Sequence, residues 1–219
     1  MVRLFFILLL LGGQVSAGAW PRDKGTWFGS TAIRFAWPRG QWPLEAPAQY
    51  YTLYMEYGLT DQVTLGLDAG RSVSGAGKTI LFARYPIRNR NTGLKVGAEL
   101  GAGRIDGAFV IRPGLSLGYG FAAKRGSGWI SVDTVAEMTL ETSNTDFKAD
   151  ITYGRSMPNG TKWILQLQSG KPANQDMFLR FAPSLVIDLK KGRMFEVGAT
   201  IGAKNDSEIG LKIGMWHHF

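Results

Sequence analysis

Cysteine is absent from this chain of 219 residues, which excludes disulfides, thiolate nucleophiles and cysteine metal sites. Histidine is scarce, because His217 and His218 are the only two. Adjacent residues on a strand point to opposite faces, so these two imidazoles are poorly placed to share a metal ion. A catalytic histidine needs a nucleophile beside it, whereas both histidines are expected at the rim of the last strand. We therefore expect no cofactor and no metal site, and we do not expect an enzyme.

Long apolar runs are also scarce. Residues 4–11 are apolar, but a helix that crosses a bilayer takes about 20 residues. The run follows Arg3 and precedes a small-residue ending, Val15-Ser16-Ala17, which is the pattern of a secretory signal peptide. We predict a signal peptide over residues 1–17 and one mature domain over residues 18–219. Cleavage is expected after Ala17, with cleavage after Ala19 as the alternative.

Glycine and aromatic residues are abundant: the chain holds 29 Gly, 12 Phe, 7 Tyr and 7 Trp, a composition that favours packed β-structure. After residue 17 no useful length of helical periodicity occurs, and segments of about ten residues alternate between apolar and polar positions instead. In residues 192–203, for example, Phe195 and Val197 lie on one face while Glu196 and Gly198 lie on the other.

This alternation predicts an all-β fold of about twelve strands, with ten or fourteen as alternatives. The predicted strands lie near residues 25–37, 48–58, 62–71, 77–87, 93–103, 108–121, 128–138, 146–156, 161–170, 176–189, 192–203 and 207–218. Strands of a soluble sandwich are shorter, whereas these are long enough to cross a bilayer when tilted. We therefore predict a closed antiparallel transmembrane β-barrel with short outer loops, of which 38–47 is the longest.

Two features suggest which face of the predicted barrel points inward. One face of the strands is rich in glycine and in charges of both signs, which suits a narrow lumen with ion pairs. Aromatic residues lie near the strand ends, as in the interfacial girdles of membrane barrels. The girdle residues predicted in this way are Trp27, Trp37, Trp42, Tyr51, Tyr57, Tyr85, Trp163, Trp216 and Phe219.

The last strand alternates up to a terminal aromatic residue, through Ile209, Leu211, Ile213, Met215 and Phe219. It resembles the assembly signal of Gram-negative outer-membrane β-barrel proteins, and it departs from that signal at His217, where an aromatic or aliphatic residue is usual. The resemblance implies the cell outer membrane as the location. It also implies outer-membrane lipids, the barrel-insertion machinery and periplasmic chaperones as partners. No nucleic acid is expected, because the interior charges are of mixed sign and the chain is secreted.

Projecting the strands gives a predicted set of charged residues that line the lumen, with cations and anions nearly in balance. The cations are Arg34, Arg84, Lys95, Arg112, Lys148, Arg180 and Lys212. The anions are Glu56, Asp68, Glu99, Asp133, Glu137, Asp150, Asp188 and Glu196.

Such a balance admits two interpretations, because an unpaired charge in a narrow lumen is costly. The charges either brace the barrel by mutual pairing or line a water-filled passage that sorts small solutes. The first functional hypothesis is a small, porin-like passive pore for polar or ionic solutes whose identity the sequence does not reveal. A closed structural or interaction barrel is the alternative. A lipid-modifying enzyme is a second alternative, which rests only on analogy with other barrels.

Overall fold

The computed structural model describes residues 18–42, 44–89 and 93–219, so the predicted signal peptide lies outside the described residues. The described residues form twelve strands, as the alternation predicted. The strands are β1 (Trp27–Pro38), β2 (Ala48–Gly58), β3 (Thr64–Ser72), β4 (Gly77–Arg88), β5 (Leu94–Ile105), β6 (Ala108–Ala122), β7 (Ser127–Thr139), β8 (Thr145–Ser156), β9 (Lys162–Lys171), β10 (Phe178–Asp188), β11 (Arg193–Lys204) and β12 (Glu208–His218). The described residues contain no helix that is long and apolar enough to cross a membrane.

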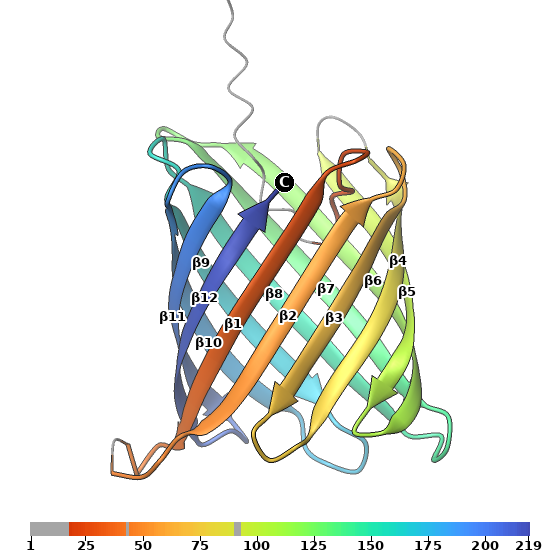
Figure 1. Ribbon diagram of the computed structural model, residues 1–219, viewed down its shortest axis with the longest axis vertical. Helices are drawn as coiled ribbons and strands as arrows, with labels where there is room; N and C mark the ends of the chain where they lie inside the picture. Colours follow the sequence, from red (N-terminus) through yellow and green to blue (C-terminus); the bar gives the residue numbers. More distant parts are fainter. Residues whose placement is uncertain (1–17, 43, 90–92) are drawn as a thin grey trace, which may run out of the picture.

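Each strand pairs antiparallel with its neighbours in the sequence, and β1 pairs with β12 to close the sheet. The barrel therefore has no unpaired edge, and its strands are strongly tilted in Figure 1. The start of β1 and the chain's C-terminus lie at the same end of the barrel, which we call the terminal end. The opposite end, which carries the connection 39–47, is called the loop end.

The connections between strands are short, and 39–47 is the longest of them. The tightest connection is Asp106-Gly107 between β5 and β6, where both residues adopt positive φ values of 48° and 89°. Asp-Gly favours this backbone because a two-residue hairpin turn that matches strand twist needs positive φ at both positions. No connection is long enough to form a folded plug at the loop end.

Large apolar side chains cover the outside of the barrel. Every strand has at least one that is more than a third exposed, such as Trp27, Leu53, Leu65, Leu81, Leu100, Leu115, Ile130, Ile151, Leu165, Phe181, Val197 and Leu211. An apolar surface that encircles a whole molecule is unfavourable in water and favourable in lipid. Since the sheet is also closed, the chain is a transmembrane β-barrel.

Candidate functional site

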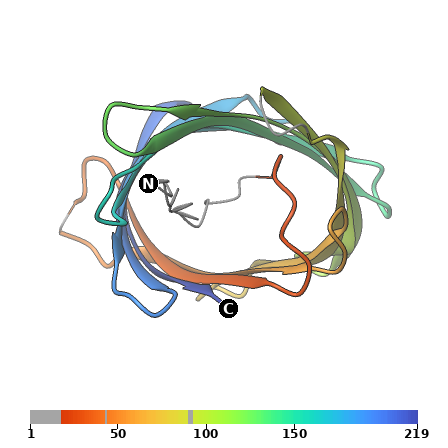
Figure 2. The ribbon, with the colours of Figure 1, turned by 90° about the horizontal axis from the view of Figure 1, so that it is seen from above.

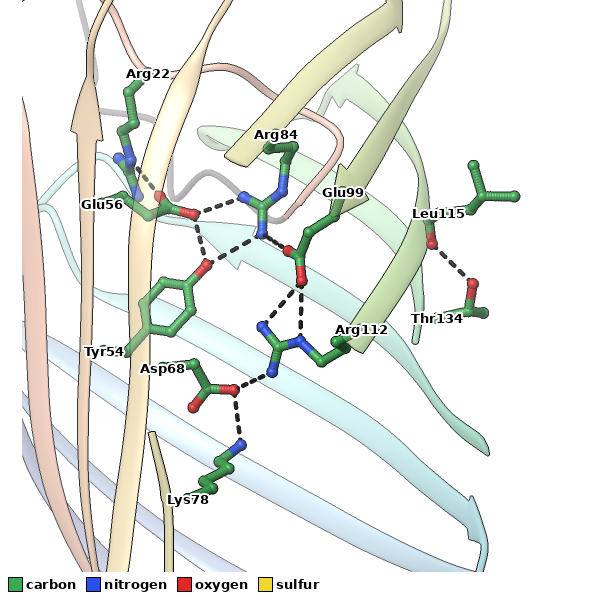
Figure 3. A network of polar contacts seen from close by, with 10 residues as sticks. All are labelled: Arg22, Tyr54, Glu56, Asp68, Lys78, Arg84, Glu99, Arg112, Leu115 and Thr134. Carbon is green, nitrogen blue, oxygen red and sulfur yellow. Dashed lines mark hydrogen bonds and ion pairs between the residues drawn. The ribbon is translucent and has the colours of Figure 1, made fainter. Parts of the chain in front are cut away.

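A network of charged side chains runs along the interior of β2–β6 (Figure 3). Arg84 binds the Glu56 carboxylate at 2.6 Å and the Glu99 carboxylate at 2.8 Å. Arg112 then binds Glu99 at 2.9 Å and Asp68 at 2.6 Å, so arginines and carboxylates alternate along the network. Removing one member of a buried pair costs about 3–5 kcal/mol, because the partner charge is left uncompensated.

Strand register brings these charges together. Arg84 on β4 is the direct cross-strand partner of Glu99 on β5. Glu56 lies opposite Gly66, and Glu99 lies opposite Gly114 on its other side. Gly66 leaves room for the Phe82 ring, because a Cβ there would lie 2.1 Å from it, and the Arg84 and Arg112 guanidinium groups lie over that ring at 5.0 and 5.6 Å from its centroid.

The chain before β1 begins inside the barrel at the terminal end and passes to the barrel rim, as the view along the axis shows (Figure 2), with Ala19, Trp20 and Arg22 buried and residues 23–25 exposed. The Arg22 guanidinium binds Glu56 at 2.5 Å, and the Arg22 backbone N–H donates to the Thr64 hydroxyl at 2.9 Å. Glu56 is therefore held between Arg22 and Arg84, and Tyr54 donates its hydroxyl hydrogen to the same carboxylate at 2.6 Å. This arrangement ties the N-terminal segment, defined as residues 18–24, to the charged network.

Glycines on the barrel strands make room for the N-terminal segment. A Cβ at Gly118 on β6 would lie 2.4 Å from the Trp20 ring, and one at Gly97 on β5 would lie 2.9 Å from the Gly18 carbonyl oxygen. A Cβ at Gly58 would lie 2.1 Å from the Asp23 carbonyl oxygen. These distances are shorter than van der Waals contact, so the segment fits only because these positions lack a side chain.

An apolar cluster fills part of the interior at the terminal end. Trp20 and Ala19 of the N-terminal segment pack there with inward-pointing side chains from six strands: Phe28, Trp129, Ile164, Val186, Met194 and Trp216. The prediction of Trp216 as a girdle residue was therefore wrong. Trp216 is only 7% exposed, and its indole N–H donates to Glu196 at 2.8 Å. The sequence did indicate this orientation. Trp216 lies four positions after Lys212 in β12, so the two side chains share the interior face, while Met215 points outward.

The interior at the loop end carries ion pairs that stay partly exposed. Arg34 and Arg180 both reach Glu208, at 3.3 and 3.1 Å, and Arg180 also binds Asp206 at 2.7 Å. Lys148 binds Glu137 at 2.5 Å while its side chain remains 44% exposed. The side chains of Arg34 and Glu208 are 30% and 39% exposed. These pairs therefore contrast with Glu56, Arg84, Glu99 and Arg112, whose side chains are at most 8% exposed.

The remaining predicted residues have different surroundings. Lys212 binds Glu196 at 2.8 Å. Lys95 donates to the Asn89 side chain near the terminal end. Asp188 is exposed at the end of β10 and accepts the Lys190 backbone N–H at 2.7 Å. Asp133 and Asp150 are cross-strand partners on β7 and β8, and neither belongs to an ion pair among the described residues.

Sequence reasoning missed several members of these networks. Lys78 and Glu208 have the phase of inward-pointing neighbours on their strands, so alternation could have identified them. Arg22 and Asp206 lie outside every strand, so no periodicity marked them. Within the described parts of the chain, no group of three or more His, Asp or Glu residues could hold a metal ion.

Comparison with known proteins gives structural matches only. No family model matches the chain, and no curated protein matches it. Among solved structures it is similar to the NanC porin, with 11% identity and a TM-score of 0.65, over 86% of this chain and 98% of that chain. It is similar to the KdgM porin, with 10% identity and a TM-score of 0.61, over 87% and 99% of the two chains.

A third similar structure is an outer-membrane channel from Pseudomonas putida F1, with 12% identity and a TM-score of 0.57, over 94% of this chain and 100% of that chain. All three matches extend over nearly the whole of the compared barrels. The chain therefore has the fold of outer-membrane porins and channels.

Proposed function

We propose that this chain is a narrow passive pore for small polar or ionic solutes in the outer membrane of a Gram-negative cell. The observation that carries the proposal is the partial exposure of interior charges at the loop end. Lys148, Arg34 and Glu208 keep 30–44% of their side-chain surface open although they project from the interior face of a closed barrel. Charged groups in such a position are favourable only where water reaches them, so they favour a hydrated passage.

The charges also bear on the class of solute. Both cations and carboxylates lie at the loop end, so a polar solute that gives up part of its hydration there can contact groups of either charge. One solved structure of the similar KdgM porin is described as a complex with disordered oligogalacturonate. We infer a polar or charged small solute for this chain and assign no particular compound.

Planar-bilayer recording tests the pore directly. Purified, folded chain is added to a lipid bilayer, and we expect discrete conductance steps that are absent with heat-denatured protein. Electrically silent membranes at saturating protein, with the barrel shown to be folded and inserted, would contradict the proposal. Uptake of neutral and charged solutes into liposomes then ranks the solute classes.

A closed structural barrel is a second candidate, favoured by the apolar cluster at the terminal end. Trp20, Trp129 and Trp216 occupy the interior there, and the N-terminal segment adds to the obstruction. A chain that lacks residues 18–24 separates the candidates. If only the shortened chain conducts, the N-terminal segment closes the barrel. If both chains conduct, the passage runs beside the segment.

We also propose that the last strand carries the assembly signal for the insertion machinery. Phe219 is 77% exposed at the end of the chain, so the ring face that does not stack on His217 is accessible to another protein. Replacing Phe219 with Ala should reduce the fraction of chain that reaches the membrane folded, measured by heat-modifiable electrophoresis. Phe109→Ala removes another exposed aromatic and serves as the control. Equal folded fractions for the two variants would count against a signal at Phe219.

A further inference from the structure

Gly18, at the beginning of the N-terminal segment, is held closely against β6 and β7. A Cβ on Gly18 would lie 2.3 Å from the Ser116 hydroxyl oxygen and 2.6 Å from Asp133 Oδ1. The Gly18 backbone N–H interacts with the Asp133 carboxyl group. Gly18 therefore brings a backbone nitrogen, and no side chain of its own, to this carboxylate, which also interacts with the Ser116 hydroxyl of β6.

The Asp133 carboxylate is incompletely satisfied by its own strand. Oδ2 accepts the Ser131 hydroxyl hydrogen at 3.0 Å. Oδ1, the oxygen nearest to Gly18, is buried and accepts no hydrogen bond of good geometry from the described residues. A buried carboxylate oxygen in this state is costly unless a cation or a strong donor approaches it.

A second acidic residue lies beside Asp133, so a cation here would interact with two carboxyl groups. Asp150 on β8 is the direct cross-strand partner of Asp133, so the two carboxylates project from adjacent positions on the same face. Elsewhere in the interior, Glu56, Glu137 and Glu196 each bind a cation. No described side chain forms such a pair with Asp133 or Asp150.

Signal-peptide cleavage after Ala17, as the sequence predicts, would supply a cation at this position. A signal peptidase hydrolyses the Ala17–Gly18 peptide bond with one water molecule, which leaves a carboxylate on Ala17 and an ammonium group on Gly18. The backbone nitrogen that lies beside Asp133 in the full chain becomes this ammonium group. We propose that the α-ammonium of Gly18 in the processed chain binds the Asp133 carboxylate, beside Asp150, and thereby anchors the N-terminal segment in the lumen.

The processed end of the chain is the first test. The intact mass of protein purified from outer membranes should correspond to a chain that begins at Gly18. A mass that corresponds to a chain beginning at Trp20, which is the product of cleavage after Ala19, would overturn the proposal because Gly18 would be lost.

Amine labelling then measures the contact itself. A chain that begins at Gly18 is refolded, and the labelling rate of its α-amino group is followed by peptide mass spectrometry. We expect the Asp133→Asn variant to label about tenfold faster, which corresponds to the loss of one favourable contact. Glu208→Gln removes an interior carboxylate at the loop end, away from the N-terminal segment, and should leave the rate unchanged. Equal rates for Asp133→Asn and the parent chain would overturn the proposal.

A matched pair of chains distinguishes the loss of this contact from a general loss of packing in Asp133→Asn. The second chain keeps Ala17 in front of Gly18, so the Gly18 nitrogen is again an uncharged amide. Asp133→Asn should lower the melting temperature of the Gly18-initiated chain and change that of the Ala17-initiated chain far less. Equal losses in both chains would show that the ammonium is not the partner of Asp133. None of these measurements depends on conductance, so they are independent of the proposed pore.

Discussion

The two ends of the barrel interior are built from different chemistry. At the terminal end, apolar rings such as Trp20, Trp129 and Trp216 pack together, and the N-terminal segment lies among them. At the loop end, ion pairs such as Lys148–Glu137 and Arg34–Glu208 keep part of their surface open. The buried network through Glu56 and Arg84 connects the two regions. The difference is that apolar side chains fill much of the interior at one end, while the other end presents charge to water.

The largest expected effect comes from Glu56→Gln. This substitution leaves the buried Arg22 without an ion-pair partner among the described residues, and it removes one of the two carboxylates that bind Arg84, which keeps Glu99. We expect a loss of about 3–5 kcal/mol in the free energy of unfolding, because the buried Arg22 guanidinium loses its compensating charge. Urea titration of the reconstituted barrel, followed by tryptophan fluorescence, measures this loss. A loss no larger than that of an exposed pair would mean that the network does not brace the terminal end.

Gly118→Leu should disturb the terminal end selectively. The new side chain competes with Trp20 for space, since even a Cβ at Gly118 would lie 2.4 Å from the Trp20 ring. Overpacking of this kind costs about 1–3 kcal/mol, and displacement of the segment should also raise single-channel conductance. Gly120→Leu is the matched control, because its Cβ would meet its nearest atom only at 4.0 Å. Unchanged conductance in Gly118→Leu would indicate that the segment does not obstruct the path.

Lys148→Glu tests the electrostatic role of the loop end. Lys148 is 44% exposed and pairs with Glu137. The substitution therefore replaces a paired cation with a second carboxylate beside the proposed solute path. We expect the reversal potential in a salt gradient to move toward cation preference, because the local potential becomes more negative. Lys124→Glu, in the exposed connection between β6 and β7 at the terminal end, is the control. If both variants give the parent reversal potential, the loop end does not sort ions.

The smallest expected effect comes from Glu208→Gln at the loop end. Glu208 contacts Arg34 and Arg180, but Arg180 keeps Asp206 as a partner and Glu208 is 39% exposed. Exposed pairs contribute up to about 1 kcal/mol, so the free energy of unfolding should fall by no more than that. The same urea titration provides the comparison with Glu56→Gln. A loss as large as that of Glu56→Gln would remove the energetic contrast between the two ends.

Much of the architecture could be predicted from the alternation of apolar and polar residues along the chain. Alternation in segments such as 192–203 predicted the strand count and the class of barrel, because a strand presents successive side chains to opposite faces wherever it occurs. The same pattern marked Arg84, Glu99 and Arg112 as members of one face, and the structure brings their side chains together. It also contained the information that Trp216 shares a face with Lys212, which the expectation of aromatic girdles overrode.

By itself, then, the sequence determined the twelve alternating strands and which face of each is polar. Only the tertiary structure decided which charges meet, because pairs such as Arg112–Asp68 depend on the stagger between strands that are not adjacent. It alone placed Arg22 against Glu56 and Thr64, since a segment outside the strands has no period to mark its position. The physical reason is that alternation is a local property of one strand, whereas the interior is a property of the closed sheet.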